Sequence, residues 1–209
     1  GARDAEELAR QQAKLVAALK DIDADVVGLM EVENDGYGPD SALARLTAAL
    51  GPAWRYVDPG QNRLGDDAIA VGLIYRGDAV AEAGTAATTA AGAFGNDTNR
   101  QPLAQTFRPL NGGEAVTVVV NHFKSKGSCP DDGVNAEQGD LQGCWNAERV
   151  AAAEQLLSWL ESDPTGADEG NRLITGDLNS YAMEDPITTL RDAGLVDLIQ
   201  RFQGEEAYS

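Results

Sequence analysis

Apolar residues recur along this chain at two spacings, one typical of helices and the other of strands. Leucine and alanine return every three or four positions, and we predict helices over 4–20, from Ser41 through Leu50, over 145–160 and near 186–192. Short runs rich in Val, Ile and aromatic residues predict strands at 26–30, 54–57, 68–75, 79–83, 103–108, 115–121, 172–175 and 195–198.

The order of these segments indicates how they pack. Asn111-Gly112-Gly113 predicts a hairpin between the strands on either side of it, and 79–83 is expected to pair with 68–75. The segment 26–30 is apolar enough to be buried on both faces of a sheet. Hairpins mixed with helix-separated strands favour an α/β fold of four layers, in which two packed sheets are flanked by helices. Length and composition suit one domain over 1–209.

The chain carries a formal charge of −18, which by itself argues against a nucleic-acid partner. Non-specific affinity for DNA comes from Lys and Arg side chains that displace counterions. An enzyme that bridges phosphate through a bound cation is still compatible with this charge, and solubility or adaptation to salt is its ordinary explanation. No run of about eighteen apolar residues is present, so no membrane span is predicted.

Two cysteines, Cys129 and Cys144, flank a polar loop and predict a disulfide. A bridge of this span is worth about 3 kcal/mol in the chain-entropy model and implies an oxidising compartment. Two reduced thiols are the alternative, and a zinc site with His122 fits no usual spacing. The loop also holds potential Ca²⁺ ligands, although a solvated acidic loop is the interpretation we favour. These side chains are Asp131, Asp132, Asn135, Glu137 and Asp140.

Polar clusters directly follow three of the apolar strands. Glu31 ends the first, where a carboxylate is costly unless a cation or hydrogen bonds meet it. It is either a Mg²⁺ ligand or a strand end that reaches solvent. Asp177 and Asn179 follow another strand, and they form either a site for phosphate and water or a simple turn.

The third cluster contains the only histidine in the sequence. His122 ends the strand 115–121, and Lys124 and Lys126 follow it closely. A site of phosphoryl transfer needs a group that moves a proton and cations near the developing charge. A surface strand end is the alternative interpretation of this cluster.

Together these segments resemble the endonuclease/exonuclease/phosphatase superfamily, which has the DNase-I-like fold. Within it, the chain is similar to secreted bacterial nucleases that degrade extracellular DNA. The resemblance covers nearly the whole chain in the family's order, with ADVVGLMEVEN at 24–34, DAIAVGLIY at 67–75, NRQPL at 99–103, NHFKSK at 121–126 and GDLNSY at 176–181. The first of these resembles the family's metal-binding glutamate strand, and the last its Asp/Asn signature.

The resemblance implies a role for each matching residue. Glu31 would hold Mg²⁺ or Mn²⁺, and His122 would protonate the leaving oxygen or contact the phosphate. Arg100 would steady the charge on the phosphate. Asp177 and Asn179 would orient the attacking water and the metal shell.

Four further residues have expected roles around the histidine. Asp67 would be a carboxylate partner for His122. The remaining three, Asn121, Lys124 and Lys126, would help to bind the substrate.

The activity implied by the resemblance is metal-dependent hydrolysis of phosphodiester bonds in extracellular DNA. The alternatives are a phosphatase or phospholipid phosphodiesterase of the same superfamily, and a non-catalytic binding module on the same scaffold. The family's first strand and its last strand, which carries an Asp-His pair, have no match in 1–209. The resemblance therefore implies that these residues alone are inactive and self-associate through exposed sheet edges.

Overall fold

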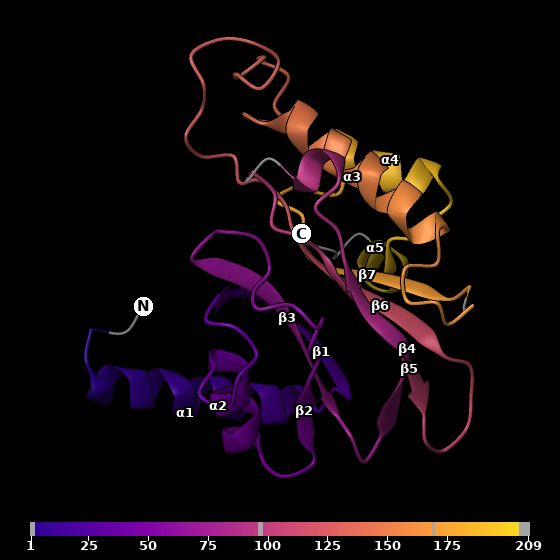
Figure 1. The fold of residues 1–209 in the computed structure, drawn as a ribbon. Coiled ribbons are helices and arrows are strands. Elements are labelled where there is room, and N and C mark those ends of the chain that lie inside the picture. Colours follow the sequence, from indigo (N-terminus) through magenta and orange to yellow (C-terminus); the bar gives the residue numbers. More distant parts are fainter. Residues whose placement is uncertain (1–2, 96–97, 169, 205–209) are drawn as a thin grey trace.

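The computed structural model describes residues 3–95, 98–168 and 170–204, and there the strands form two sheets (Figure 1). The first sheet has the order β1-β3-β2 and is antiparallel. Its strands are β1 (Val26–Glu33), β2 (Trp54–Tyr56) and β3 (Ile69–Arg76). The second has the order β4-β5-β6-β7, with β6 and β7 parallel and the other pairs antiparallel. Its strands are β4 (Val80–Thr88), β5 (Leu103–Pro109), β6 (Val116–His122) and β7 (Arg172–Asp177).

Helices cover the outer faces of both sheets, so the molecule has four layers (Figure 1). The described helices are α1 (Ala5–Ile22), α2 (Ala42–Leu50), α3 (Asn146–Glu161), α4 (Asp185–Asp192), α5 (Leu198–Gln203) and a 3₁₀ turn at Gly92–Phe94. Apolar residues of α1 and α2 pack on the first sheet, and those of α3 and α4 pack on the second. The expected α/β sandwich flanked by helices is confirmed.

The two sheets pack face to face around a core that includes Val71, Leu73, Leu103 and Phe107. Gly28 of β1 lies where they approach closely, since a Cβ there would be 3.1 Å from Thr175 Cγ2 and 3.2 Å from Val120 Cγ2. The absence of a side chain at Gly28 thus sets the spacing between β1 and the ends of β6 and β7.

The predicted helices and the hairpin between β5 and β6 are confirmed, but three other predictions are wrong. None of the residues of β1 is fully buried, because β1 is the edge strand of its sheet among the described residues. The segment 79–83 belongs to β4, which pairs with β5 in the second sheet and not with β3. The segment 195–198 does not begin a strand. Asp197 accepts a hydrogen bond from the backbone N–H of Gln200 at 3.0 Å and starts α5, so N-cap chemistry prevails over a short apolar run.

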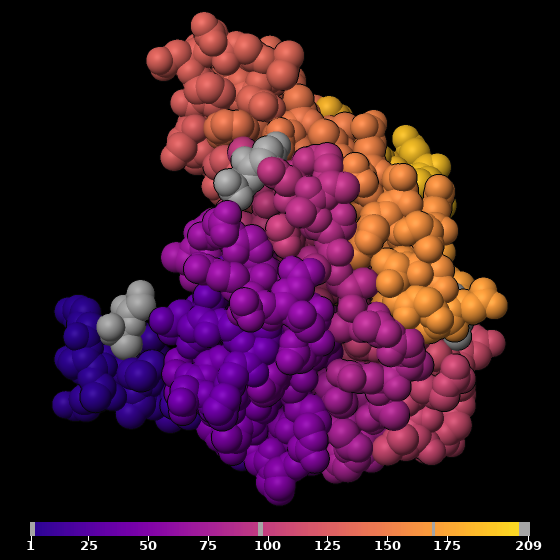
Figure 2. All heavy atoms as spheres, viewed as in Figure 1, coloured from indigo at the N-terminus to yellow at the C-terminus, as the bar shows by residue number. Residues whose placement is uncertain are grey.

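The loop between β6 and α3 projects beyond the body of the molecule as a separate lobe (Figure 2). The predicted disulfide joins Cys129 to Cys144 in this loop, with 5.4 Å between the Cα atoms. Because both cysteines are in the bridge, a zinc site that uses them is excluded. No helix in the described part of the chain is both long and apolar enough to cross a bilayer.

Reduction of this bridge should loosen the lobe and lower the stability of the protein. We expect no reactive thiol in unfolded, unreduced protein, and a loss of about 3 kcal/mol in unfolding free energy in the Cys129→Ser/Cys144→Ser variant. Thiol titration and urea unfolding measure these two quantities. Two titratable thiols, or a variant as stable as the parent, would show that the bridge does not form in the protein.

Candidate active site

A bulge in β1 sets the position of Glu31. Leu29 pairs with Gly72 and Val32 with Ala70, so Met30 and Glu31 together face a single residue of β3. Glu31 has φ 57°, in the left-handed region, which costs a non-glycine residue about 1–2 kcal/mol. Bulges of this kind re-aim side chains and are common beside active sites. As a result, Glu31 is exposed near the end of β1 and does not take part in the regular pairing with β3.

The end of β6 carries two buried polar side chains with unsatisfied atoms. Asn121 is fully buried and His122 is 6% exposed. The Oδ1 atom of Asn121 and the Nδ1 atom of His122 have no hydrogen-bond partner within the described structure. Buried polar groups in native proteins are normally bonded, so each of these two atoms points to an additional partner, either water or a ligand, on its own face of the sheet.

His122 and Asp177 are register partners at the ends of the parallel strands β6 and β7. The pKa of His122 is lowered from its ordinary value, first by burial and then by the positive charge of Arg100. Asp177, Glu31 and Asp67 act on it in the opposite direction. The three strand-end clusters are thus brought together around one imidazole, and burial favours its neutral form.

The backbone of Arg100 is bonded to that of His122, because the Arg100 backbone N–H donates to the His122 carbonyl oxygen at 3.0 Å. Its Nη2 atom is 2.5 Å from Asp67 Oδ2, while its buried Nε atom has no partner in the described structure. Asp67 therefore engages Arg100, and the structure shows no hydrogen bond between Asp67 and His122. The carboxylate acts on the imidazole through space alone.

Asn34, which the sequence analysis did not select, holds the segment that carries Asp67. Its side-chain amide donates to the carbonyl oxygens of Leu64 and Asp67, both at 2.9 Å, and its Oδ1 accepts from the N–H of Leu64 at 3.2 Å. Asn34 directly follows β1, so the same strand end places both Glu31 and the partner of Arg100. An Asn shortly after a strand is common in turns, and its sequence position alone gave no sign of this role.

The turn after β7 is tied to the end of β6. Asp177 Oδ1 accepts from the N–H of Asn179 at 2.9 Å, and Asn179 Nδ2 donates to the carbonyl oxygen of Phe123 at 2.9 Å. The N–H of Phe123 in turn donates to the carbonyl oxygen of Asp177 at 2.9 Å. Asn179 thus fixes the backbone beside His122, while the Asp177 side chain stays exposed.

Gly176 allows these two strands to meet, and replacing it should destabilise the fold. A Cβ at Gly176, where φ is +117°, would lie 2.1 Å from the carbonyl oxygen of Asn121. Gly194 is a matched control, with φ +94° and nothing within 4 Å of a Cβ. Both alanine variants bear backbone strain, but overpacking should cost Gly176→Ala a further 1–3 kcal/mol or so. Urea unfolding measures the difference, and equal losses in the two variants would contradict the close approach.

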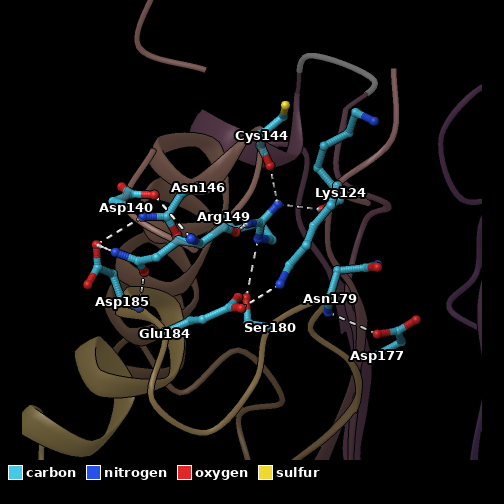
Figure 3. A network of polar contacts seen from close by, with 12 residues as sticks. Lys124, Asp140, Cys144, Asn146, Arg149, Asp177, Asn179, Ser180, Glu184 and Asp185 are labelled. Carbon is cyan, nitrogen blue, oxygen red and sulfur yellow. Dashed lines mark hydrogen bonds and ion pairs between the residues drawn. The ribbon is translucent and has the colours of Figure 1, made fainter. Parts of the chain in front are cut away.

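Arg149, also missed from the sequence, anchors the loop after β6 (Figure 3). It is fully buried in α3 and donates to the carbonyl oxygens of Lys124, Gln142 and Cys144 at 3.3, 3.0 and 2.7 Å. Its Nε also donates to Ser180 Oγ at 3.2 Å. A charged residue at helical spacing from the buried Ala152, Ala153 and Leu156 was the available sign.

The two lysines that follow His122 have different surroundings. Lys126 Nζ is 2.5 Å from Oε1 of Glu184, whose side chain is 8% exposed. No carboxylate of the described structure forms an ion pair with Lys124, whose backbone N–H donates to Asn99 Oδ1 at 2.9 Å. Burial, Arg100 and Arg149 together lower the pKa of Lys124. Lys124 is thus better placed than Lys126 to meet a phosphate.

Among the described residues, no group of three or more His, Cys, Asp or Glu side chains could enclose a metal ion. Mg²⁺ does not need such a group, because it typically takes one or two carboxylates and completes its shell with water and phosphate oxygens. The exposed carboxylate of Glu31 is an oxygen donor of this kind, whereas the buried Asn121 lies on the opposite face of β6, with Val119 and Phe123. Glu31 therefore fits an ion whose shell is completed mainly by water and phosphate oxygens.

The fold is shared with several solved enzymes, although the sequences are distant. The human Nocturnin catalytic domain superposes with a TM-score of 0.67 at 16% identity, over 96% of this chain and 68% of that one. The Bacteroides thetaiotaomicron mannosyl-6-phosphatase superposes with a TM-score of 0.61 at 14% identity, over 92% of this chain and 67% of that one. D. rerio TDP2 complexed with single strand DNA product superposes with a TM-score of 0.58 at 16% identity, over 97% of this chain and 66% of that protein.

Further structures with this fold belong by name to the endonuclease/exonuclease/phosphatase family. The chain has the fold of that superfamily, and the resemblance seen in the sequence is confirmed at this level. It spans about two thirds of the length of the three proteins just compared. No protein-family model and no curated protein sequence matches the chain.

Proposed function

We propose that this protein hydrolyses phosphodiester bonds in DNA with the help of Mg²⁺ or Mn²⁺, and that it acts outside the cell. The observation that carries this proposal is the convergence of Glu31, His122 and Asp177 from the ends of β1, β6 and β7, with Arg100 beside the imidazole. The fold supports phosphoester chemistry, since a mannosyl-6-phosphatase and a protein with bound DNA product share it. The disulfide supports an oxidising location.

In this proposal different side chains bind the phosphate, orient the attacking water and hold the metal ion. Arg100 and Lys124 place positive charge beside the phosphate, which offsets the charge that develops in phosphoryl transfer. Asp177, exposed at the end of β7, accepts a hydrogen bond from the attacking water and orients it. A divalent ion held by Glu31 supplies a Lewis acid that polarises the phosphate when it is bound.

The lowered pKa of His122 favours one of its two expected roles. A neutral imidazole can donate an N–H to a phosphate oxygen or accept a proton, whereas protonating the leaving oxygen requires the imidazolium form. Burial and the charge of Arg100 both disfavour that charged form. Contact with the phosphate is therefore the role that the surroundings of His122 support better.

The net charge of −18 bears on how DNA would be held. With little general attraction for a polyanion, binding depends on the local cations Arg100 and Lys124 and on a bound metal ion. Weak binding that depends on divalent ions is the expected behaviour. Self-association through free sheet edges stays a prediction, although β1 and β7 each have one unpaired edge among the described residues.

A plasmid assay on the full-length protein tests the function. Supercoiled plasmid should be nicked in the presence of Mg²⁺ or Mn²⁺ and stay intact with EDTA. The mannosyl-6-phosphatase fold favours phosphomonoester hydrolysis as the second candidate, so mannose 6-phosphate belongs in the same assay. Phosphate release from the sugar with no plasmid cleavage under any divalent ion would replace the DNA proposal.

A further inference from the structure

Two lysine–aromatic pairs lie on the loops that leave the candidate active site. Lys124 Nζ is 4.8 Å from the centroid of the Trp145 ring, and Lys126 Nζ is 4.5 Å from that of Tyr181. Lys124 comes shortly after His122, and Tyr181 comes shortly after Asn179. We call Lys124, Trp145, Lys126 and Tyr181 the basic–aromatic strip. It gathers cations and rings in a chain whose overall charge is strongly negative.

The backbone at Tyr181 is fixed, and Lys126 covers only one face of its ring. The N–H of Glu184 donates to the Tyr181 carbonyl oxygen at 2.9 Å, and Arg149 holds the neighbouring Ser180. The residue is nevertheless 56% exposed. A large ring on a fixed backbone loses little conformational freedom when a ligand binds to it.

Lys126 and Lys124 contribute to this strip in different ways. Lys126 is held over the ring of Tyr181 by its ion pair with the buried Glu184, so its charge is largely neutralised. Lys124 has no such carboxylate, and its ammonium donates to the carbonyl oxygens of Ser125 and Gly127, both at 3.3 Å. The strip therefore offers an exposed ring on a fixed backbone, together with a cation without a carboxylate partner, Lys124, on the side of the strip that carries Trp145.

From this arrangement we infer that Tyr181 is a stacking platform for an unpaired base of single-stranded DNA, with Lys124 holding a phosphate of the same strand. The inference rests on the proposed function, because it names the form of nucleic acid that the same site takes. A base can lie on a protein ring only when its own face is free, and in a duplex those faces are covered by stacking. The site thus favours strands that are single or locally opened.

Two fluorescent oligonucleotides of about eight nucleotides test the inference, one with bases and one abasic with the same number of phosphates. Anisotropy is measured on the full-length protein with EDTA present, so that no cleavage occurs. The parent protein should bind the base-containing strand about tenfold more tightly than the abasic strand. Tyr181→Ala should remove that difference, whereas Tyr181→Phe should keep it.

Two further variants separate stacking from other effects. Met183→Ala alters a residue on the same loop that is 81% exposed, and it should change neither affinity. Lys124→Ala should weaken both strands alike and lower the slope of log affinity against log salt by about 0.7. A duplex of the same sequence should gain nothing from Tyr181.

Equal affinity of the parent protein for the two strands would overturn the inference. So would an unchanged preference for bases in Tyr181→Ala, since the ring would then serve only to cover the ion pair beneath it. Because binding is measured without metal, its outcome is independent of the plasmid assay. Base-dependent binding without plasmid cleavage would sink the proposed hydrolysis alone, and cleavage without base-dependent binding would sink this inference alone.

Discussion

Replacing His122 by alanine is expected to lower kcat/KM for plasmid hydrolysis by at least about a hundredfold, the low end for loss of one hydrogen-bond donor to the charge that develops on the phosphate. His122 is the residue on which the charges of Arg100, Asp177, Glu31 and Asp67 all act. His122→Gln should lose less, because its side-chain amide can still donate a hydrogen bond to a phosphate oxygen but does not titrate. Initial rates on the full-length protein give both values, with urea unfolding as the check that the variants fold.

The pH dependence of the parent protein adds a second readout. Because the pKa of His122 lies below its usual value of 6.5, the neutral imidazole persists into more acidic solution. If the neutral form is needed, kcat/KM should fall only below that value, and this acid limb should be absent from the residual activity of His122→Gln. Residual activity within tenfold of the parent, with the same acid limb, would remove His122 from the mechanism.

Glu31→Gln is expected to lower kcat/KM by at least about a hundredfold as well, because a neutral amide is a poor substitute for a carboxylate at a Mg²⁺ ion. The Mg²⁺ concentration that gives half-maximal activity should rise at least about tenfold. The substitution keeps the size and shape of the side chain, so stability should change little. A Mg²⁺ titration of activity measures both effects.

Glu33→Gln is a matched control on the same strand. Glu33 is exposed, and its nearest cation is Arg45, with 3.6 Å between Nη2 and Oε2. Removing this surface charge should leave the Mg²⁺ titration within about twofold, because exposed ion pairs contribute little. If both glutamine variants behave alike, a general loss of negative charge is responsible and Glu31 is not a metal ligand.

Local pattern was enough to predict the parts of the fold whose partners are adjacent in sequence. The hairpin of β5 and β6 follows from alternation and from Asn111-Gly112-Gly113, and Ser41 begins α2 as its N-cap. Position after an apolar strand was also enough to bring His122 and Asp177 to one place, because β6 and β7 run parallel and end side by side.

The remaining features depend on partners that sequence pattern does not reveal. The bulge at Glu31 exists only in the pairing of β1 with β3, and no local rule assigns a left-handed conformation to a glutamate. The ion pair of Asp67 with Arg100 joins segments that are distant in the chain, as do the bonds of Asn34 to the loop before β3. The partner of β4 was misjudged for the same reason, since periodicity predicts a strand but not its neighbour.

The close approach at Gly28 makes the geometry of the candidate active site depend on the absence of a Cβ atom at this residue. A methyl group at this position would have to displace Thr175 or Val120 by a few tenths of an ångström, and each lies shortly before a residue of the site on its own strand. Such a shift is small for a folded protein but not for a reaction, where a misplacement of about 1 Å can cost a hundredfold in rate. Gly28 thus works as a spacer between the carboxylate on one sheet and the imidazole on the other. A larger residue at position 28 would change the distance between Glu31 and His122 without replacing either of them.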